Sequence, residues 1–116
     1  MGLRSSAKHS NDRLQGTLDL LVLKTLATRG AMHGYAITLQ ISTLTESVLQ
    51  VQEGSLYPAL HRMAEAGWVK SSWGASDHNR RARFYTITAA GRRRLADEEA
   101  HWASLTAAVG RVLKHA

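Results

Sequence analysis

The spacing of apolar residues changes its period directly after Gly67. Before that glycine, Leu56, Leu60 and Met63 recur at intervals of three and four residues, the periodicity of one face of a helix. In residues 69–73 the period is two, which is typical of a strand whose side chains alternate between faces. A chain with this order of periods has to combine helices with extended structure.

A second extended run, residues 82–87, predicts a β-hairpin. The intervening residues 74–81, GASDHNRR, have the composition of an exposed loop longer than a two-residue turn. Helices are predicted over residues 17–29, over 33–43, from 53–55 up to Gly67, and after Thr88 as N-cap. This order is that of a mainly α (α+β) winged helix-turn-helix fold with a two-stranded wing.

Length and charge favour one small basic domain. The chain has 116 residues, a formal net charge of +6 and no cysteine, which excludes disulfides and thiolate metal sites. No apolar stretch approaches the roughly 18 residues that span a bilayer, and the N-terminal residues lack the apolar centre of a signal peptide, so we expect a cytoplasmic protein with no membrane partner. The expected parts are a flexible basic arm (1–13), a winged helix-turn-helix DNA-binding domain (14–87) and a C-terminal dimerisation helix (88–116).

Basic residues concentrate around the predicted wing. Between His78 and Ala96 there are six arginines and no acidic residue. Arg80, Arg81 and Arg83 indicate a surface that neutralises phosphates of double-stranded DNA. The arginines at positions 92–94 fit a solvated helix face equally well, because acidic residues follow at positions 97–99.

The third predicted helix carries a polar face opposite its apolar stripe. Arg62 and His61 are the first candidates for base or phosphate contacts in the major groove, together with Pro58. Tyr57 is expected mainly to pack at the edge of the core, with its hydroxyl within reach of a phosphate. Ser55 is equally well explained as the helix cap or as a phosphate contact. Pro58 is tolerated if it lies in the first turn and otherwise kinks the helix.

Catalytic and metal-binding patterns are missing from the sequence. The six histidines show no HExxH and no close helical pair, and no GxSxG, GxGxxG or phosphate-loop motif occurs. Glu98 and Glu99 are sequence neighbours on a helix and point about 100° apart, which does not suit an acid/base pair. We therefore expect neither an enzyme nor a cofactor or metal site.

An apolar seam runs along the last predicted helix, formed by Trp102, Leu105, Val109 and Val112. Packing back onto the first helix is one interpretation. Pairing with a second copy of the chain is the favoured one, since so small a domain has few other partners for it. A dimer would bring two recognition helices about 34 Å apart, matching successive major grooves of a palindromic operator.

With these residues in view, the chain resembles the PadR family of bacterial transcriptional regulators. The resemblance covers residues 14 to about 102. Four segments carry it, in the family's order: LQGTLDLLVLKTL, HGYAI, EGSLYPALHRMAEAGWV and NRRARFYTITAAGRRRL. The short C-terminal region is similar to that of the family's compact branch.

The resemblance implies a homodimeric winged-helix regulator, usually a repressor, whose third helix enters the major groove and whose wing touches the backbone or minor groove. It also implies dimerisation through the first helix and residues 88–112. Some relatives bind aromatic or drug-like effectors beside a tryptophan of the terminal helix, and Trp102 is similarly placed, although anchoring the dimer core is the commoner role of such a residue. The implied interface comprises Leu18, Leu21, Val22, Leu95, Trp102, Leu105, Val109 and Val112. The competing hypothesis is a winged-helix module that binds a protein partner and no specific DNA.

Overall fold

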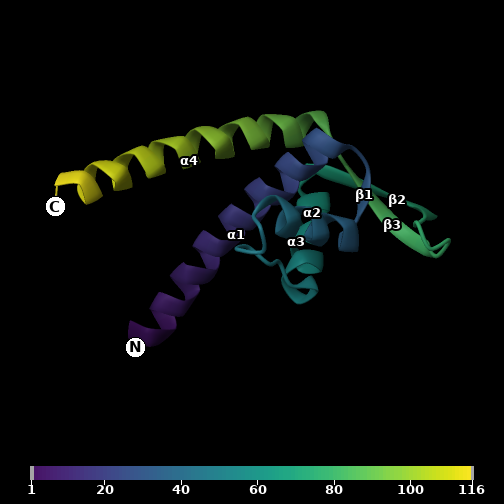
Figure 1. Cartoon of the computed structure of the whole chain (residues 1–116), viewed down its shortest axis with the longest axis horizontal. Coiled ribbons are helices and arrows are strands. Elements are labelled where there is room, and N and C mark those ends of the chain that lie inside the picture. The colour runs from purple at the N-terminus through teal and green to yellow at the C-terminus, as the bar shows by residue number, and fades with distance from the viewer. Residues whose placement is uncertain (1, 116) are drawn as a thin grey trace.

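The computed structural model describes residues 2–115, and the side chains of residues 16–115. Its elements are α1 (Gly2–Arg29), β1 (Met32–His33), α2 (Gly34–Leu44), α3 (Glu53–Glu65), β2 (Val69–Ala75), β3 (Arg81–Ile87) and α4 (Ala89–His115). Figure 1 shows the β2–β3 hairpin projecting from one side of the helical body, while the distal end of α4 points the opposite way. The fold is a winged helix of the α+β class, as predicted.

Helix α1 begins at Gly2, well before the expected residue 17, and ends at Arg29 as predicted. Gly30 ends it in the left-handed conformation, with φ of 89°, and donates its N–H to the Leu26 carbonyl at 2.9 Å. The expected basic arm, residues 1–13, has its side chains outside the described residues. Its mobility stays a prediction.

The sheet has three antiparallel strands in the order β1-β3-β2. The short strand β1 is not predictable from apolar periodicity, because it has only two residues and is defined by pairing with β3. His33 belongs to it rather than to the second helix, and its Nδ1 caps α2 by accepting the Ala36 N–H at 3.3 Å. Its ring also meets the edge of Phe84, with 5.3 Å between ring centroids.

The core lies where α1, α2 and α3 meet the inner face of the sheet. The apolar stripe predicted for α3 is confirmed, since Leu56, Leu60 and Met63 are fully buried. The residues that pack with it are Val22, Leu23, Leu26, Ile37, Ile41, Ala59, Val69, Tyr85 and Leu95. Burial of these side chains is the main stabilising contribution and sets the position of α3 on the body.

Helix α3 begins at Glu53, within the predicted range, but its capping residue differs from the one considered. Gln52 is the N-cap and makes no side-chain cap hydrogen bond, whereas Ser55 lies three residues into the helix. The interpretation of Ser55 as the cap is therefore wrong. Pro58 is the sixth residue of the helix, beyond the first turn, and α3 continues through it to Glu65.

Thr88 caps α4 as predicted and ties the helix to the base of the wing. Its hydroxyl accepts the Gly91 N–H at 3.0 Å and donates to the Gly67 carbonyl at 2.6 Å. Its backbone N–H donates to the Trp68 carbonyl at 3.0 Å. These bonds bring α4 so close to Trp68 that only glycine fits at position 91.

Replacing Gly91 by Ala is expected to lower the free energy of unfolding by about 2 kcal/mol, because overpacking forces the surroundings apart. A Cβ there would overlap the Trp68 carbonyl oxygen and lie 2.7 Å from Cγ1 of Ile87. Urea unfolding followed by circular dichroism measures the change. Gly110→Ala is the matched control in the same helix, where a Cβ meets nothing within 4 Å, and it should be neutral or stabilising by up to about 1 kcal/mol. Equal stability of Gly91→Ala and the parent protein would contradict the expectation.

Within residues 2–115, no helix combines the length and the apolar character needed to cross a membrane.

Candidate DNA interface

Helix α3 exposes the polar face expected from its periodicity. Ser55, Tyr57, Pro58 and His61 are all exposed: Pro58 and His61 lie opposite the buried stripe, and Ser55 and Tyr57 lie at its flanks. His61 Nε2 lies 3.3 Å from a carboxylate oxygen of Glu65, one turn further along the same face. The first two turns of α3 therefore present short polar groups and a proline to solvent, a surface that fits a major groove.

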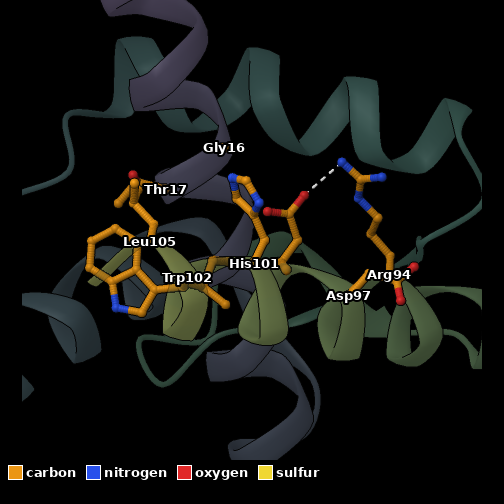
Figure 2. A pocket seen from close by; sticks show the side chains of 9 residues that line it. Gly16, Thr17, Arg94, Asp97, His101, Trp102 and Leu105 are labelled. Atoms are coloured by element: carbon orange, nitrogen blue, oxygen red, sulfur yellow. Dashed lines mark ion pairs between the residues drawn. The ribbon is translucent and has the colours of Figure 1, made fainter. Parts of the chain in front are cut away.

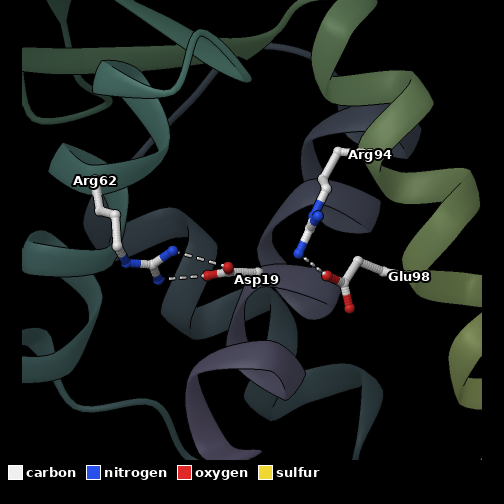
Figure 3. Close-up of polar contacts among 4 residues, drawn as sticks. All are labelled: Asp19, Arg62, Arg94 and Glu98. Carbon is white, nitrogen blue, oxygen red and sulfur yellow. Dashed lines mark hydrogen bonds and ion pairs between the residues drawn. The ribbon is translucent and has the colours of Figure 1, made fainter. Parts of the chain in front are cut away.

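Arg62, the first candidate for a base contact, is held by a residue of α1. Its two terminal nitrogens donate to the two carboxylate oxygens of Asp19 at 2.7 and 3.0 Å. Figure 3 shows Arg62 reaching from α3 to Asp19 through these two contacts. The Asp19 side chain is 5% exposed, and the hydrogen bond to it raises the pKa of Arg62 above its ordinary value. This bidentate pair fixes α3 to α1 and leaves Arg62 less free to read a base.

Tyr57 packs as expected, with a specific neighbour that periodicity could not identify. Its ring covers Gly34 so closely that a Cβ on the glycine would lie 2.5 Å from the Tyr57 hydroxyl. Partial burial, the first cause, and the nearby Glu53 and Tyr85 raise the pKa of Tyr57, so its hydroxyl stays protonated at neutral pH. Tyr57 thus joins α3 to the start of α2 while its outer edge remains exposed.

The wing carries the three predicted arginines, all exposed. Its loop closes with bonds from the Ser76 N–H to the Arg80 carbonyl and from the Asn79 N–H to the Ser76 carbonyl, both at 2.8 Å. The guanidinium carbons of Arg81 and Arg83 lie 4.3 and 5.0 Å from the centroid of the Trp73 ring. Trp73 therefore belongs to this site, although the alternating pattern of residues 69–73 predicted only a strand there.

Arg81 and Arg83 of the wing lie on the side of the sheet that faces α3. Because side chains alternate between the two faces of a strand, Arg81, Arg83 and Tyr85 lie on the same face of β3. Tyr85 is buried on that face, in the same core cluster as Leu56, Leu60 and Met63 of α3. The inner face of the hairpin therefore continues outward as a basic surface beside α3.

The three arginines at the start of α4 are exposed, and Arg94 has partners within the helix and the wing base. It forms an ion pair with Glu98 at 2.6 Å, and its guanidinium carbon lies 4.7 Å from the Trp68 ring centroid. For Arg94 this agrees with the solvated helix-face interpretation.

A groove of about 630 Å³ lies between α1 and the first half of α4. Figure 2 shows Trp102 and Leu105 of α4 beside Thr17 of α1, with His101 and Arg94 further along the groove. Beyond it, the seam residues Val109 and Val112 are exposed, so the distal half of the seam has no cover among the described residues. Packing onto α1 therefore explains the apolar residues in the first half of α4 only.

The structure corrects two residues of the implied dimer interface. Val22 is 0% exposed and Leu95 is 6% exposed, because both lie in the core of a single chain. Their side chains offer almost no area to a second subunit. Leu18 and Leu21 are half-buried and keep some surface on α1.

Among the described residues, no group of three or more His, Asp or Glu side chains could hold a metal ion.

Comparison with known proteins agrees with this geometry. The family model described as the transcriptional regulator PadR-like family matches residues 22–97. A transcriptional regulator from Clostridium thermocellum is 26% identical, with a TM-score of 0.77 over 86% of this chain and 96% of that chain. A PadR family transcriptional regulator from Eggerthella lenta is 28% identical, with a TM-score of 0.72 over 100% and 99%.

A PadR-like transcriptional regulator from Bacillus cereus, 24% identical, shares the fold with a TM-score of 0.75 over 90% of this chain and 99% of that chain. The matched region contains all three core strands and helices α2 and α3, so it includes both surfaces of the candidate interface. The family model is that of transcriptional regulators. The chain belongs to the PadR-like family of transcriptional regulators.

Proposed function

We propose that the protein is a homodimeric repressor that binds a palindromic operator, with α3 in the major groove and the wing on the flanking backbone or minor groove. One observation carries the proposal: Arg81 and Arg83 of the wing lie on the side of the sheet that faces α3. A duplex lying across α3 would meet Arg81 and Arg83 on the same approach. Guanidinium groups in that position neutralise phosphates and release counterions.

The residues of α3 have different roles in this proposal. Ser55, Pro58 and His61 are exposed on the outward face and contact base edges or nearby phosphates. Arg62 acts mainly through Asp19, which keeps α3 in position, and Tyr57 acts mainly by packing on Gly34. Arg80, Arg81 and Arg83 contact phosphates from the wing.

The exposed seam of α4 supports a dimer. Trp102, Leu105, Val109 and Val112 follow one another at spacings of three and four, and each remains about half exposed or more in a single chain. A second copy would remove this apolar area from water, with Leu18 and Leu21 of α1 at its edge. The groove beside Trp102 would then lie near the subunit boundary, where an aromatic effector could bind and alter the spacing of the two α3 helices.

Selection of bound sites from random duplexes, followed by titration, tests the proposal. We expect an inverted repeat with half-sites about one helical turn apart, bound about 10³-fold or more tightly than scrambled duplex at physiological salt. Arg81→Ala should weaken binding to all sequences and reduce the salt slope by about one. Lys70→Ala, a cation on the other face of the same hairpin, is the matched control and should change neither.

Equal affinity for selected and scrambled duplexes would refute specific regulation. Absence of any salt-dependent duplex binding would favour the competing hypothesis of a protein-binding winged-helix module. A pull-down in the presence of nuclease would then separate a protein partner from nucleic acid carried along with it.

A further inference from the structure

The inner face of the wing changes character along its length. In the register of the hairpin, Val69 pairs with Ile87 and Ser71 with Tyr85, next to the core. Further out on the same face, Trp73 pairs with Arg83. This face of the hairpin is therefore apolar where it packs on the helical body, and it is aromatic and cationic where the hairpin projects into solvent.

Trp73 lies on this projecting part of the hairpin, where it is 54% exposed and contacts two cations at once. Arg83 lies directly across the strand pair, and Arg81 lies two residues further along β3 on the same face. Both guanidinium carbons are within the range of a favourable cation–π contact with the one indole ring. We call this group of three side chains the Trp73 cluster.

No carboxylate in the described part of the chain forms an ion pair with Arg81 or Arg83. This distinguishes them from Arg62 and Arg94, which hold Asp19 and Glu98. Contact with an aromatic ring uses none of the N–H donors of a guanidinium group. Arg81 and Arg83 are therefore restrained in position while their donors stay open to an anion.

Two like charges held on one ring are well placed for a phosphate. An isolated exposed arginine loses side-chain freedom when it binds, and that loss opposes binding. Trp73 restrains both side chains before DNA arrives, so less freedom remains to be lost. The attraction of each guanidinium group to the indole ring offsets part of their mutual repulsion.

We propose that Trp73 is a positioning residue for DNA binding, which pre-orders Arg81 and Arg83 to grip the phosphodiester backbone beside each half-site. This inference rests on the proposed function. Its occupant is the backbone phosphate of duplex DNA, so it predicts an effect on affinity that is independent of base sequence.

A double-mutant cycle on the full chain tests the role of Trp73. We expect Trp73→Leu to lower affinity for the selected operator and for random duplex by the same factor, about fivefold, which corresponds to about 1 kcal/mol. The salt slope should stay unchanged, because both arginines remain available to phosphates. Trp73→Phe keeps an aromatic face and should recover most of the affinity.

The decisive comparison uses the Arg81→Ala/Arg83→Ala background, in which Trp73→Leu should have no further effect on affinity. A fivefold loss that persists in that background would overturn the inference, since Trp73 would then contact DNA itself. Binding of Trp73→Leu equal to the parent protein would also overturn it. The cluster is exposed, so thermal unfolding by circular dichroism should show an unchanged Tm for every variant.

These outcomes are separable from failure of the proposed function. If the parent protein prefers its selected operator by about 10³-fold while Trp73→Leu binds as the parent does, the function stands and the role of Trp73 is refuted. If the parent protein binds no duplex, both are refuted.

Discussion

The double substitution Leu105→Glu/Val109→Glu is expected to convert the proposed dimer into a monomer and to lower operator affinity by at least about 100-fold. Both side chains lie on the apolar seam of α4 and are close to half exposed in the single chain. In a dimer each carboxylate would be buried against apolar groups and against its symmetry mate, which is unfavourable without a partner of opposite charge. Losing the second half-site removes the gain of about 10² to 10⁴ that linked binding provides.

Analytical ultracentrifugation and operator titration measure the two consequences together. Ala100→Glu/Ala107→Glu is the matched control, because it adds the same charge on the opposite face of the same exposed helix and should leave assembly and affinity unchanged. Circular dichroism should show equal helix content in both variants. A seam variant that sediments as the parent protein does would contradict the proposed interface.

The fold was largely predictable because its elements have strong local signals. The stripe on α3, the alternation in β2 and β3, and Thr88 before α4 each depend on residues within a few positions of one another. The start of α3 was predicted correctly, but its cap was misjudged because Ser55 is a better capping residue than Gln52, and propensity alone favours the better cap.

The candidate site was predictable only as a set of faces. Periodicity identifies which residues of one element share a side, but it does not identify a partner on another element. Arg62 and Asp19 are 43 positions apart, and their pairing depends on how α3 crosses α1. The Trp73 cluster depends on the hairpin register, which an uncertain loop length conceals. Val22 and Leu95 were assigned to the dimer interface because the spacing of apolar residues along a helix is the same whether they face the core or a second subunit.

The ion pair between α1 and α3 leads to the second large expected effect. Asp19→Ala should lower the free energy of unfolding by about 2–3 kcal/mol. Removing one partner of a fully buried pair typically costs about 3–5 kcal/mol, and the smaller figure applies because the Arg62 side chain is 38% exposed and can turn partly to water. Urea unfolding measures the change.

Another ion pair of α1 supplies the control. Lys24 and Glu99 are 3.0 Å apart, but both are about half exposed, so Glu99→Ala should change stability by no more than about 0.5 kcal/mol. In the double variant Asp19→Ala/Arg62→Met no buried charge is left unpaired, so its destabilisation should be smaller than the sum of the two single changes. If Asp19→Ala and Glu99→Ala lowered the free energy of unfolding equally, the Asp19–Arg62 pair would not have the stabilising role expected of it.

Asp19→Ala also distinguishes two roles of Arg62, which are positioning α3 and reading a base. If Arg62 positions α3 through Asp19, then Asp19→Ala weakens operator binding even in conditions where the variant is fully folded, because α3 loses a fixed contact with α1. If Arg62 reads a base, Asp19→Ala frees its guanidinium and preserves or improves binding, while Arg62→Ala relaxes the preference at one base position. The bidentate geometry, with both Asp19 oxygens engaged, favours the first outcome. Operator titration of Asp19→Ala under conditions where circular dichroism shows it folded therefore decides whether this arginine acts on DNA directly or through the helix that carries it.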